Sequence, residues 1–321
     1  MASLPEFNRL HALVQKANKI LLIADGKPDG DSLGSSSGFL NWLIREGKTA
    51  QAFCAAPIPR TFSYLNGIHL FRNDAATFKE SWDLIITFDA GDLRHCGVET
   101  LLPQVTSPYT LVNIDHHATN ARYGQLNLVY IDACSTCEVV YRFLTNEGIR
   151  LDSAIATSLL TGVLTDTSSF SNSATTSPGM EAAAVLSAAG ARTNEIYYHL
   201  LRNKTVDGLK IWGLALSRLA FNPSYNAVTT YFLAKDLIGV PEETIDGVSN
   251  FLNASCGEAD TILVLREMND GKVRGSMRSA KRDISKIAKL LGGGGHKKAA
   301  GFTINGRLEQ TSEGVRVVST L

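Results

Sequence analysis

Residues 19–47 read KILLIADGKPDGDSLGSSSGFLNWLIREG, and the fold class can be inferred from this stretch. It begins with an apolar run, residues 19–24, which is typical of a strand buried in a sheet. A loop rich in Asp, Gly and Pro follows, and a helical pattern then ends at Gly47, a residue that commonly terminates helices. A buried strand followed by a loop and a helix is the repeating unit of α/β proteins.

The same alternation continues along the first part of the chain. Apolar runs at residues 84–88 and 109–114 predict two more buried strands, and residues 135–147 and 153–164 predict helices. Residues 176–201 are helical in pattern and rich in alanine, which indicates a helical linker. We therefore expect an N-terminal α/β domain with a mainly parallel sheet and flanking helices, followed by this linker.

Beyond residue 200 the pattern changes, and a second, smaller α/β domain is expected there. Its helices are predicted at residues 206–220 and 283–291, and its strands at residues 227–234, 261–266 and 272–277. We place the domain boundary near residue 200, which gives domains at residues 1–200 and 201–321.

The composition is that of an ordinary globular protein. Hydrophobic residues make up 44% of the 321 residues, and the 31 basic residues balance the 31 acidic ones. Because no net positive charge attracts long duplexes, any nucleic-acid partner should be short. The five cysteines are odd in number and scattered, which suits a reducing compartment. Since no apolar run approaches the roughly 20 residues that span a bilayer, we expect a cytoplasmic protein without a membrane partner.

Acidic residues and histidines follow the predicted strands of the first domain. They are Asp25, Asp29 and Asp31 after the first strand, Asp89 after the second, and Asp115, His116 and His117 after the third. Because ligands of open α/β sheets gather at the carboxyl ends of strands, these side chains should converge. Asp166, at the end of a predicted helix, is a further candidate. Carboxylates mixed with imidazoles suit Mn²⁺ or Mg²⁺. The alternative is that they are ordinary loop residues, with Asp31 and Ser32 capping the following helix.

These residues stand in recognisable motifs. Residues 28–35 (PDGDSLGS), 89–92 (DAGD), 115–117 (DHH) and 165–167 (TDT) resemble the four motifs of the DHH phosphoesterases. Residues 292–301 (GGGGHKKAAG) resemble the glycine-rich signature of the DHH-associated C-terminal domain, and residues 275–279 (GSMRS) resemble its Ser-x-Arg-Ser element. Length and layout are most similar to the nano-RNase branch of oligoribonucleases and pAp phosphatases.

The resemblance implies two divalent metal ions, usually Mn²⁺, with Mg²⁺ as the other choice. Their ligands would be Asp25, Asp29, Asp31, Asp89, His116 and Asp166. Asp89 would bridge the two ions, and His117 would face the scissile phosphate, so that Asp89, His116 and His117 form the catalytic set. Two such ions about 3.5–4 Å apart can activate water and neutralise a leaving oxygen.

The resemblance also implies a substrate-binding role for the second domain. The residues assigned to it are Ser276, Arg278, Gly293, Gly294, Gly295 and His296, with Arg94 of the first domain as an additional basic contact. The expected substrates are short single-stranded RNA and nucleotides, including 3′-phosphoadenosine 5′-phosphate. A homodimer is expected by similarity to the family.

Asp25 departs from the family pattern, which usually carries histidine at this position. Aspartate is a competent oxygen ligand, so we expect an active site with harder coordination. Two alternatives stay open. The protein could hydrolyse linear dinucleotides derived from cyclic signalling molecules, or it could be a catalytically silent nucleotide-binding module.

Overall fold

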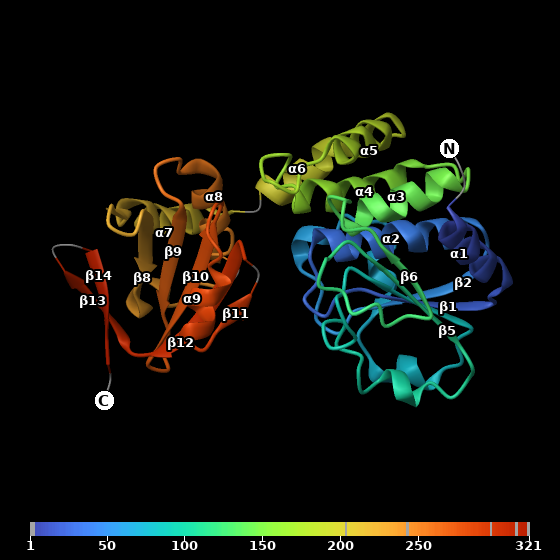
Figure 1. Ribbon diagram of the computed structural model, residues 1–321, viewed down its shortest axis with the longest axis horizontal. Helices are drawn as coiled ribbons and strands as arrows, with labels where there is room; N and C mark the ends of the chain where they lie inside the picture. The colour runs from blue at the N-terminus through green and yellow to red at the C-terminus, as the bar shows by residue number, and fades with distance from the viewer. Residues whose placement is uncertain (1–3, 203, 242–243, 296, 312–313, 320–321) are drawn as a thin grey trace. The chain divides into compact units, whose positions relative to one another are not determined.

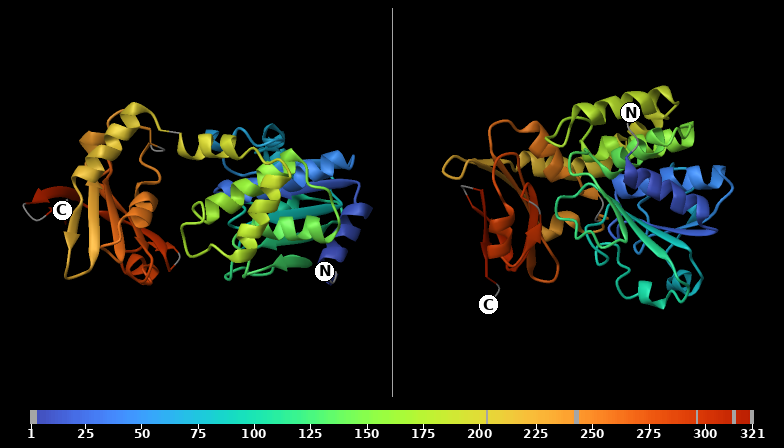
Figure 2. Two further views of the ribbon diagram at one scale, coloured as in Figure 1. Left: turned by 90° about the horizontal axis from the view of Figure 1, so that it is seen from above. Right: turned by 45° about the vertical axis from the view of Figure 1, so that its right-hand side comes forward.

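The structure is a computed structural model that describes residues 4–202, 204–241, 244–295, 297–311 and 314–319. The chain divides into two compact units, Met1–Asn203 and Lys204–Leu321. Each unit has its own sheet, which can be followed in Figures 1 and 2. Among the described residues, no helix has the length and apolar character that crossing a membrane would require.

A parallel sheet forms the centre of the first unit. Its strands are β1 (Lys19–Ile23), β2 (Thr49–Phe53), β3 (Phe71–Arg72), β4 (Leu84–Phe88), β5 (Thr110–Asp115) and β6 (Leu126–Val129). They lie in the order β3-β2-β1-β4-β5-β6, and each neighbouring pair is parallel. The central strands β1 and β4 are apolar and almost wholly buried, as strands covered on both faces must be. The expected mainly parallel sheet is confirmed.

The two faces of this sheet are covered differently. The helices of the unit are α1 (Pro5–Lys16), α2 (Gly30–Arg45), α3 (Thr136–Asn146), α4 (Ser153–Asp166), α5 (Ser177–Ala188) and α6 (Thr193–Leu201). Helices α1 to α4 lie on one face (Figure 1), where Ile20 and Leu22 of β1 share a core with Phe39 and Phe143. On the other face, Leu21 packs in a second core built from the segment between residues 75 and 105.

The predicted helical linker belongs to the core of the first unit. It consists of α5 and α6, and Leu186 of α5 and Ile196 of α6 are fully buried in the same core as the sheet. Burial of such apolar side chains stabilises a fold by about 1.5–3 kcal/mol each. Both helices contact α4.

Helices α2 and α4 approach each other closely because glycines line their contact. A Cβ atom at Gly34 would collide with the carbonyl oxygen of Ser158, and one at Gly30 would collide with the side chain of Thr165. The close approach brings the first turn of α2, which carries Asp31, beside the last turn of α4, which ends at Asp166.

The strand order reverses direction between β1 and β4. The chain leaving β1 passes through α2 on the helical face, whereas the chain leaving β4 passes over the opposite face before it enters β5. In open α/β sheets, ligands bind at the carboxyl ends of the two strands where this reversal occurs. The fold thus points to the loops that begin at Asp25 and Asp89.

The second unit contains a mixed sheet. Its strands are β7 (Ala220–Asn222), β8 (Ala227–Phe232), β9 (Thr261–Glu267), β10 (Lys272–Ser279), β11 (Gly294–Gly295) and β12 (Ala299–Asn305), in the order β11-β12-β10-β9-β8-β7, with a separate hairpin of β13 (Arg307–Thr311) and β14 (Gly314–Val318). Its helices are α7 (Val206–Ser217), α8 (Val248–Ser255) and α9 (Ser285–Leu290). Helices α7 and α8 share a core on one face, and Ala288 of α9 lies in a core on the other. The expected smaller α/β domain is confirmed.

Candidate active site

Acidic residues and histidines meet where the fold places a ligand site. Among the described residues, two groups have ligand atoms that lie within 4.8 Å of one another, namely Asp89, Asp115, His116 and His117, and Asp31, His116 and Asp166. His116 belongs to both groups. Residues from the ends of β4 and β5, the start of α2 and the end of α4 therefore converge, although they are far apart in the sequence.

His116 presents one ring nitrogen to the carboxylates. Its Nδ1 lies 3.2 Å from the carbonyl oxygen of Ala133, which can accept the Nδ1 proton. Its Nε2 lies 3.2 Å from Asp166 Oδ2 and 3.7 Å from Asp89 Oδ1, yet it is buried and makes no hydrogen bond with the described residues. A buried polar atom without a partner is rare, and a backbone contact to the other nitrogen is typical of metal-ligating histidines. The arrangement fits a cation beside Nε2.

Asp31 is oriented by the beginning of another helix. Its two carboxylate oxygens accept the N–H groups of Thr136 and Cys137, at 2.6 and 2.8 Å, in the first turn of α3. The cap of α2 is provided by Asp29, whose Oδ1 accepts the N–H groups of Asp31 and Ser32, both at 3.0 Å. The alternative in which Asp31 and Ser32 serve only as the cap of their own helix is therefore wrong for Asp31, because its carboxylate points to α3.

Asp89 has an unusual backbone. It is buried and has a φ of 59°, in the left-handed region that side chains other than glycine seldom adopt. Such conformations cost about 1–3 kcal/mol and cluster at functional sites. Its Oδ1 accepts the hydroxyl proton of Thr136 at 2.9 Å and lies 3.6 Å from Nδ1 of His117. The surrounding structure thus holds this carboxylate at the centre of the site.

Asp115 supports the site through hydrogen bonds. Its Oδ1 accepts the N–H of His116 at 2.7 Å and Nδ1–H of His117 at 2.8 Å, and its Oδ2 accepts an N–H of Asn120 at 2.5 Å. Through these hydrogen bonds Asp115 fixes the orientation of the His117 ring. The His117 side chain is 35% exposed, compared with 13% for His116, so His117 is the histidine that a substrate can reach.

The carboxylates are held in an unfavourable electrostatic environment. Burial, followed by repulsion from Asp166, raises the pKa of Asp31 to about 7. Burial and the charge of Asp31 raise the pKa of Asp89 well above its ordinary value. Burial would lower the pKa of His116, but the nearby Asp166 and Asp31 raise it to about 9. This excess of negative charge is what divalent cations neutralise.

The nearby thiol does not resemble a metal ligand. Cys137 is fully buried, and burial raises its pKa well above its ordinary value, so it remains a neutral thiol. The remaining donors are carboxylate oxygens and imidazole nitrogen, which suit hard or borderline divalent cations such as Mg²⁺ and Mn²⁺.

Asp25 and Asp29 lie at the border of the site. In the part of the chain that the structure describes, neither belongs to the two groups defined above. Asp25 Oδ1 accepts the N–H of Lys27 at 2.6 Å, and burial raises the pKa of Asp25 to about 6. The charge of Asp29 adds to the raised pKa values of Asp25, Asp31 and Asp89, so Asp29 is electrostatically part of the site.

These pKa shifts predict how the metal-free protein responds to pH. The folded pKa values of Asp25 and Asp31, about 6 and about 7, exceed the ordinary value of 3.8, so the folded state holds protons that the unfolded state has released. The folded pKa of His116, about 9, exceeds its ordinary value of 6.5, so its contribution to stability is present below pH 6.5 and is lost towards pH 9. All three groups hold more protons in the folded state than in the unfolded state, so each of them makes the free energy of unfolding fall as the pH rises. With a chelator present, the melting temperature should fall between pH 6 and pH 9.

The measurement is a set of thermal melts at pH 6, 7.5 and 9 in EDTA, with one further melt at pH 7.5 in Mn²⁺. Manganese should raise the melting temperature, since a ligand that binds only the folded state stabilises it. A metal-free protein that is equally stable or more stable at pH 9 than at pH 6 would contradict this account.

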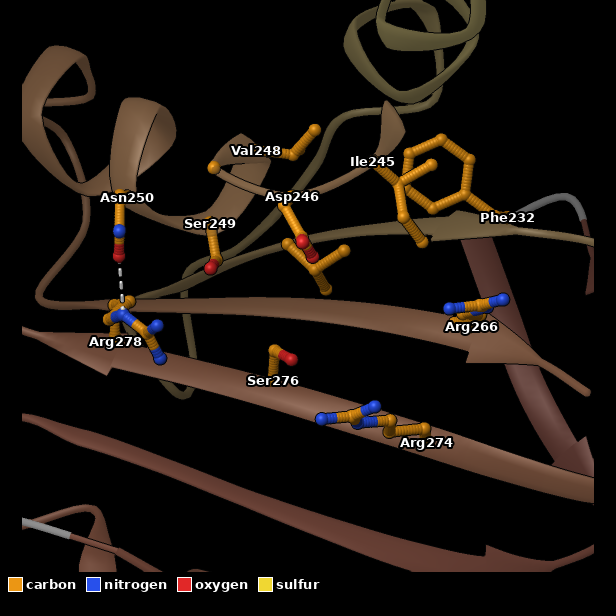
Figure 3. A pocket seen from close by; sticks show the side chains of 12 residues that line it. Phe232, Ile245, Asp246, Val248, Ser249, Asn250, Arg266, Arg274, Ser276 and Arg278 are labelled. Atoms are coloured by element: carbon orange, nitrogen blue, oxygen red, sulfur yellow. Dashed lines mark hydrogen bonds between the residues drawn. The ribbon is translucent and has the colours of Figure 1, made fainter. Parts of the chain in front are cut away.

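The second unit contains a basic pocket. A cavity of about 330 Å³ lies between β9, β10 and the segment at residues 245–250, and its lining includes Arg266, Arg274, Ser276 and Arg278 (Figure 3). Arg274, Ser276 and Arg278 alternate along β10 and so share one face, and Arg266 is the cross-strand partner of Arg274.

The two predicted contacts on β10 thus lie together in this pocket. Arg278 donates from Nε to Asn250 Oδ1 at 2.7 Å and from Nη1 to the carbonyl oxygen of Met277 at 2.9 Å, so its position is fixed. Arginines suit phosphate groups because of their forked donors. Sequence reasoning did not single out Arg266 and Arg274, although alternation with Ser276 and Arg278 would have placed Arg274 on their face.

The glycine tract lies elsewhere in the second unit. Gly294 and Gly295 form β11 and pair with Gly301 and Ala300 of β12. A Cβ atom at Gly293 would collide with the carbonyl oxygen of Gly301, so close backbone packing accounts for this glycine. None of these glycines lines the basic pocket.

His296 and Arg94 are the other two predicted substrate contacts. His296 lies outside the described residues. The Arg94 side chain is 78% exposed and forms an ion pair with Glu99, with 3.5 Å between Nε and Oε2. A surface ion pair of this kind contributes only about 0–1 kcal/mol to stability, so it would leave Arg94 available to other anions.

Comparisons with known proteins agree with the two units. Residues 19–163 match the DHH family, N-terminal domain, and residues 229–319 match the DHHA1 domain. The chain is 32% identical over 313 residues to the bifunctional oligoribonuclease and PAP phosphatase NrnA of Thermus thermophilus, and the alignment covers 96% of this chain and 91% of that protein. It is 24% identical over 298 residues to the protein of the same description in Mycoplasma genitalium, with coverage of 92% and 91%.

A solved structure shares the fold. The crystal structure of an exopolyphosphatase-related protein from Bacteroides fragilis superimposes with a TM-score of 0.85 at 21% sequence identity, covering 92% of this chain and 90% of that chain. Together, the two matched domains and the similarity to the Thermus protein over nearly its whole length show that this chain belongs to the DHH family of phosphoesterases and is a hydrolase.

Proposed function

We propose that this chain is a two-metal phosphodiesterase and phosphatase that hydrolyses short single-stranded RNA oligonucleotides and 3′-phosphoadenosine 5′-phosphate. The observation that carries the proposal is the buried Nε2 of His116, which has no hydrogen-bond partner among the described residues and faces Asp31, Asp89 and Asp166. The choice of substrate is supported by the relatives described as bifunctional oligoribonuclease and PAP phosphatase.

The residues of the site divide into two sets of ligands. Asp31, His116 and Asp166 would hold one divalent cation, Asp25 and Asp29 would hold the other, and Asp89 would contact both, with Mn²⁺ as the proposed metal. When bound, these cations supply positive charge that polarises the phosphoryl group and favours ionisation of the attacking water.

The protein's own residues orient the substrate and control a proton. The hydrogen bond to Asp115 raises the pKa of His117 above its ordinary value, which favours the protonated ring. Because this ring is partly exposed, it can donate to a phosphate oxygen and stabilise the charge that develops on the leaving group. Asp115 fixes the orientation of the ring while it does so.

The second unit would hold the rest of the substrate. The guanidinium groups of Arg266, Arg274 and Arg278 line a pocket whose volume, about 330 Å³, is at the small end of ligand sites. A pocket of this size suits one nucleotide and its phosphate, which agrees with substrates of a few residues. The balanced net charge likewise argues against long nucleic acids.

The test is a substrate panel with purified protein in Mn²⁺, Mg²⁺ or EDTA. The panel comprises an RNA dinucleotide, a long single-stranded RNA, 3′-phosphoadenosine 5′-phosphate, a 5′-phosphorylated linear diadenylate and pyrophosphate. We expect manganese-dependent turnover of the dinucleotide and of 3′-phosphoadenosine 5′-phosphate, and little turnover of the long RNA. Selective turnover of the diadenylate would favour a role in signalling. Nucleotide binding without turnover would favour a silent module, and pyrophosphate as the only substrate would refute the proposal.

Asp25 offers a second test of the active site. The wild type should turn over the dinucleotide with Asp25 in place, because aspartate supplies an oxygen ligand. Asp25→His should keep activity within about tenfold while shifting the preference towards softer metals, since imidazole suits Zn²⁺ and related ions better than carboxylate does. Rates in Mn²⁺, Mg²⁺ and Co²⁺ are the measurement. An inert wild type and an active variant would show that Asp25 silences the site.

A further inference from the structure

The first turn of α3 contacts two of the central carboxylates at once. The N–H of Thr136 donates to Asp31 Oδ2 at 2.6 Å, and the N–H of Cys137 donates to Asp31 Oδ1 at 2.8 Å. The hydroxyl of Thr136 donates to Asp89 Oδ1 at 2.9 Å. Thr136 is fully buried, so water cannot substitute for these contacts. One residue therefore links a carboxylate that follows β1 with one that follows β4.

Local structure explains why these donors are available. The side chain of Ser135 caps α3 by accepting the N–H of Glu138 at 3.0 Å. Glu138 reaches back and accepts the N–H of Cys134 at 2.7 Å, which fixes the chain entering the helix. The N–H groups in the first turn of a helix have no partner within the helix. Those of Thr136 and Cys137 are therefore directed at Asp31, where the positive end of the helix dipole also favours an anion.

We propose that Thr136 is a positioning residue for the reaction, acting through Asp89 on the binding of the divalent cations. The proposal rests on the function proposed above. A carboxylate that is to contact two cations must hold one orientation about its Cβ–Cγ bond. The hydroxyl of Thr136 fixes the position of one oxygen of Asp89. Its hydrogen bond also favours the ionised form of the carboxylate. Partners of metal ligands commonly contribute about 10–100-fold to metal affinity.

A merely structural role for Thr136 makes a different prediction. If the residue only packs α3 against its neighbours, its methyl group and its volume matter, and its hydroxyl does not. Thr136→Val keeps the shape and removes the donor, whereas Thr136→Ser keeps the donor and removes the methyl group. Thr136→Ala, which differs from the serine variant only by the hydroxyl oxygen, supplies a second comparison if the valine variant folds poorly.

Thr161 provides a matched control. It is also fully buried in the first unit, and its hydroxyl lies 2.8 Å from the hydroxyl of Tyr64 and donates to the carbonyl oxygen of Thr157 at 2.9 Å. Thr161→Val therefore removes a buried hydroxyl that bonds to other partners. It should lower the melting temperature in the manner of any lost buried hydrogen bond and leave the affinity for manganese unchanged.

The experiment titrates Mn²⁺ into the full-length, EDTA-treated protein by calorimetry and by the electron paramagnetic resonance signal of free manganese. We expect the affinity to fall about 10–100-fold in Thr136→Val and in Thr136→Ala, and to stay within about threefold of the wild type in Thr136→Ser. Excess manganese should restore much of the lost kcat/KM of the valine variant, which a packing defect would not allow.

Two outcomes would overturn the inference, namely equal affinities in wild type and Thr136→Val, or equal losses in the serine and alanine variants. A wild type that takes up no manganese would overturn both this inference and the proposed function. If the wild type binds manganese but hydrolyses no member of the substrate panel, the proposed function fails alone, and the titrations still decide the role of Thr136.

Discussion

Asp89→Asn should lower kcat/KM for an RNA dinucleotide by at least about a thousandfold, because loss of charge at the ligand proposed to contact both cations would cost several kcal/mol of transition-state stabilisation. Asparagine is the appropriate replacement, since it keeps the size of the side chain and tolerates the left-handed backbone, with φ of 59°, better than alanine does. It also retains an oxygen that can accept the hydroxyl proton of Thr136.

The same variant should have the opposite effect on the stability of the metal-free protein. Asp89 is buried, and the charges of Asp31, Asp29 and Asp166 raise its pKa further. Removing its charge removes this repulsion, so the melting temperature in EDTA should rise while activity is lost. This combination distinguishes a metal ligand from a structural residue, because replacing a structural residue would lower both the melting temperature and the activity.

The matched control for Asp89→Asn is Asp132→Asn. The Asp132 side chain is 68% exposed and pairs with Arg142 at 2.9 Å. A surface ion pair of this kind contributes about 0–1 kcal/mol, so neither activity nor stability should change much. A variant Asp89→Asn that retains more than a tenth of the wild-type rate would remove Asp89 from the catalytic set.

Gly162→Ala should destabilise the protein by about 1–3 kcal/mol and lower its affinity for manganese. Gly162 lies in α4, against α2 and α3. A Cβ atom there would lie 2.5 Å from Asp31 Oδ1 and would also collide with Sγ of Cys137. Neither neighbour can move aside easily. Both carboxylate oxygens of Asp31 are hydrogen-bonded to the first turn of α3, and Cys137 is itself a residue of that turn. The added methyl group would therefore displace a proposed ligand.

A second glycine supplies the contrast. Gly213 also lies within a helix, α7, but a Cβ atom there would meet no heavy atom within 4 Å. Gly213→Ala should thus stabilise the protein by about 0.5–1 kcal/mol, as expected from helix propensity alone. Calorimetric melts and manganese titrations of both variants test the pair. If Gly162→Ala stabilised the protein or bound manganese as the wild type does, the close packing around Asp31 would not matter for the site.

The parallel sheet could be predicted from the sequence only where its strands are buried on both faces. Strands β1, β4 and β5 are mostly apolar and mostly buried, and all three were expected. Strand β2 (TAQAF) is partly exposed and polar, β3 has only two residues, and β6 alternates between buried and half-buried positions. Their place in the sheet is decided by pairing with neighbours, which a periodicity search does not detect.

In the second unit, too, the elements without a strong apolar pattern could not be predicted from the sequence. Strands β8, β9 and β10 were expected, whereas β13, β14 and helix α8 were not. Strand β13 has one buried residue and β14 has none, so neither shows a strong apolar pattern. The sequence motif assigned Gly293, Gly294 and Gly295 to substrate binding, and the close packing of Gly293 and Gly295 against β12 became visible only in three dimensions.

The location of the site could be predicted because ligands bind at the carboxyl ends of parallel strands. The hydrogen bonds that support the site could not be predicted. Residues at the ends of β4 and β5 converge as expected, together with Asp31 and Asp166. The contributions of Thr136, Asn120 and Asp115 depend on hydrogen bonds that no local pattern reveals. Thr136, for example, is 47 positions from Asp89, and its sequence neighbours indicate only the start of a helix.

The anchoring of Asp31 by α3 constrains when the proposed cation site can form during synthesis. The donors that orient this carboxylate lie 105 and 106 positions later in the sequence. A nascent chain that has emerged only as far as β5 carries Asp31 and Asp89 without the groups of α3 that orient them, and without Asp166. The proposed cations would therefore bind late, after the domain has assembled, and would not nucleate its folding. Topologies dominated by such distant contacts fold slowly, so the growing chain exposes its apolar strands for longer.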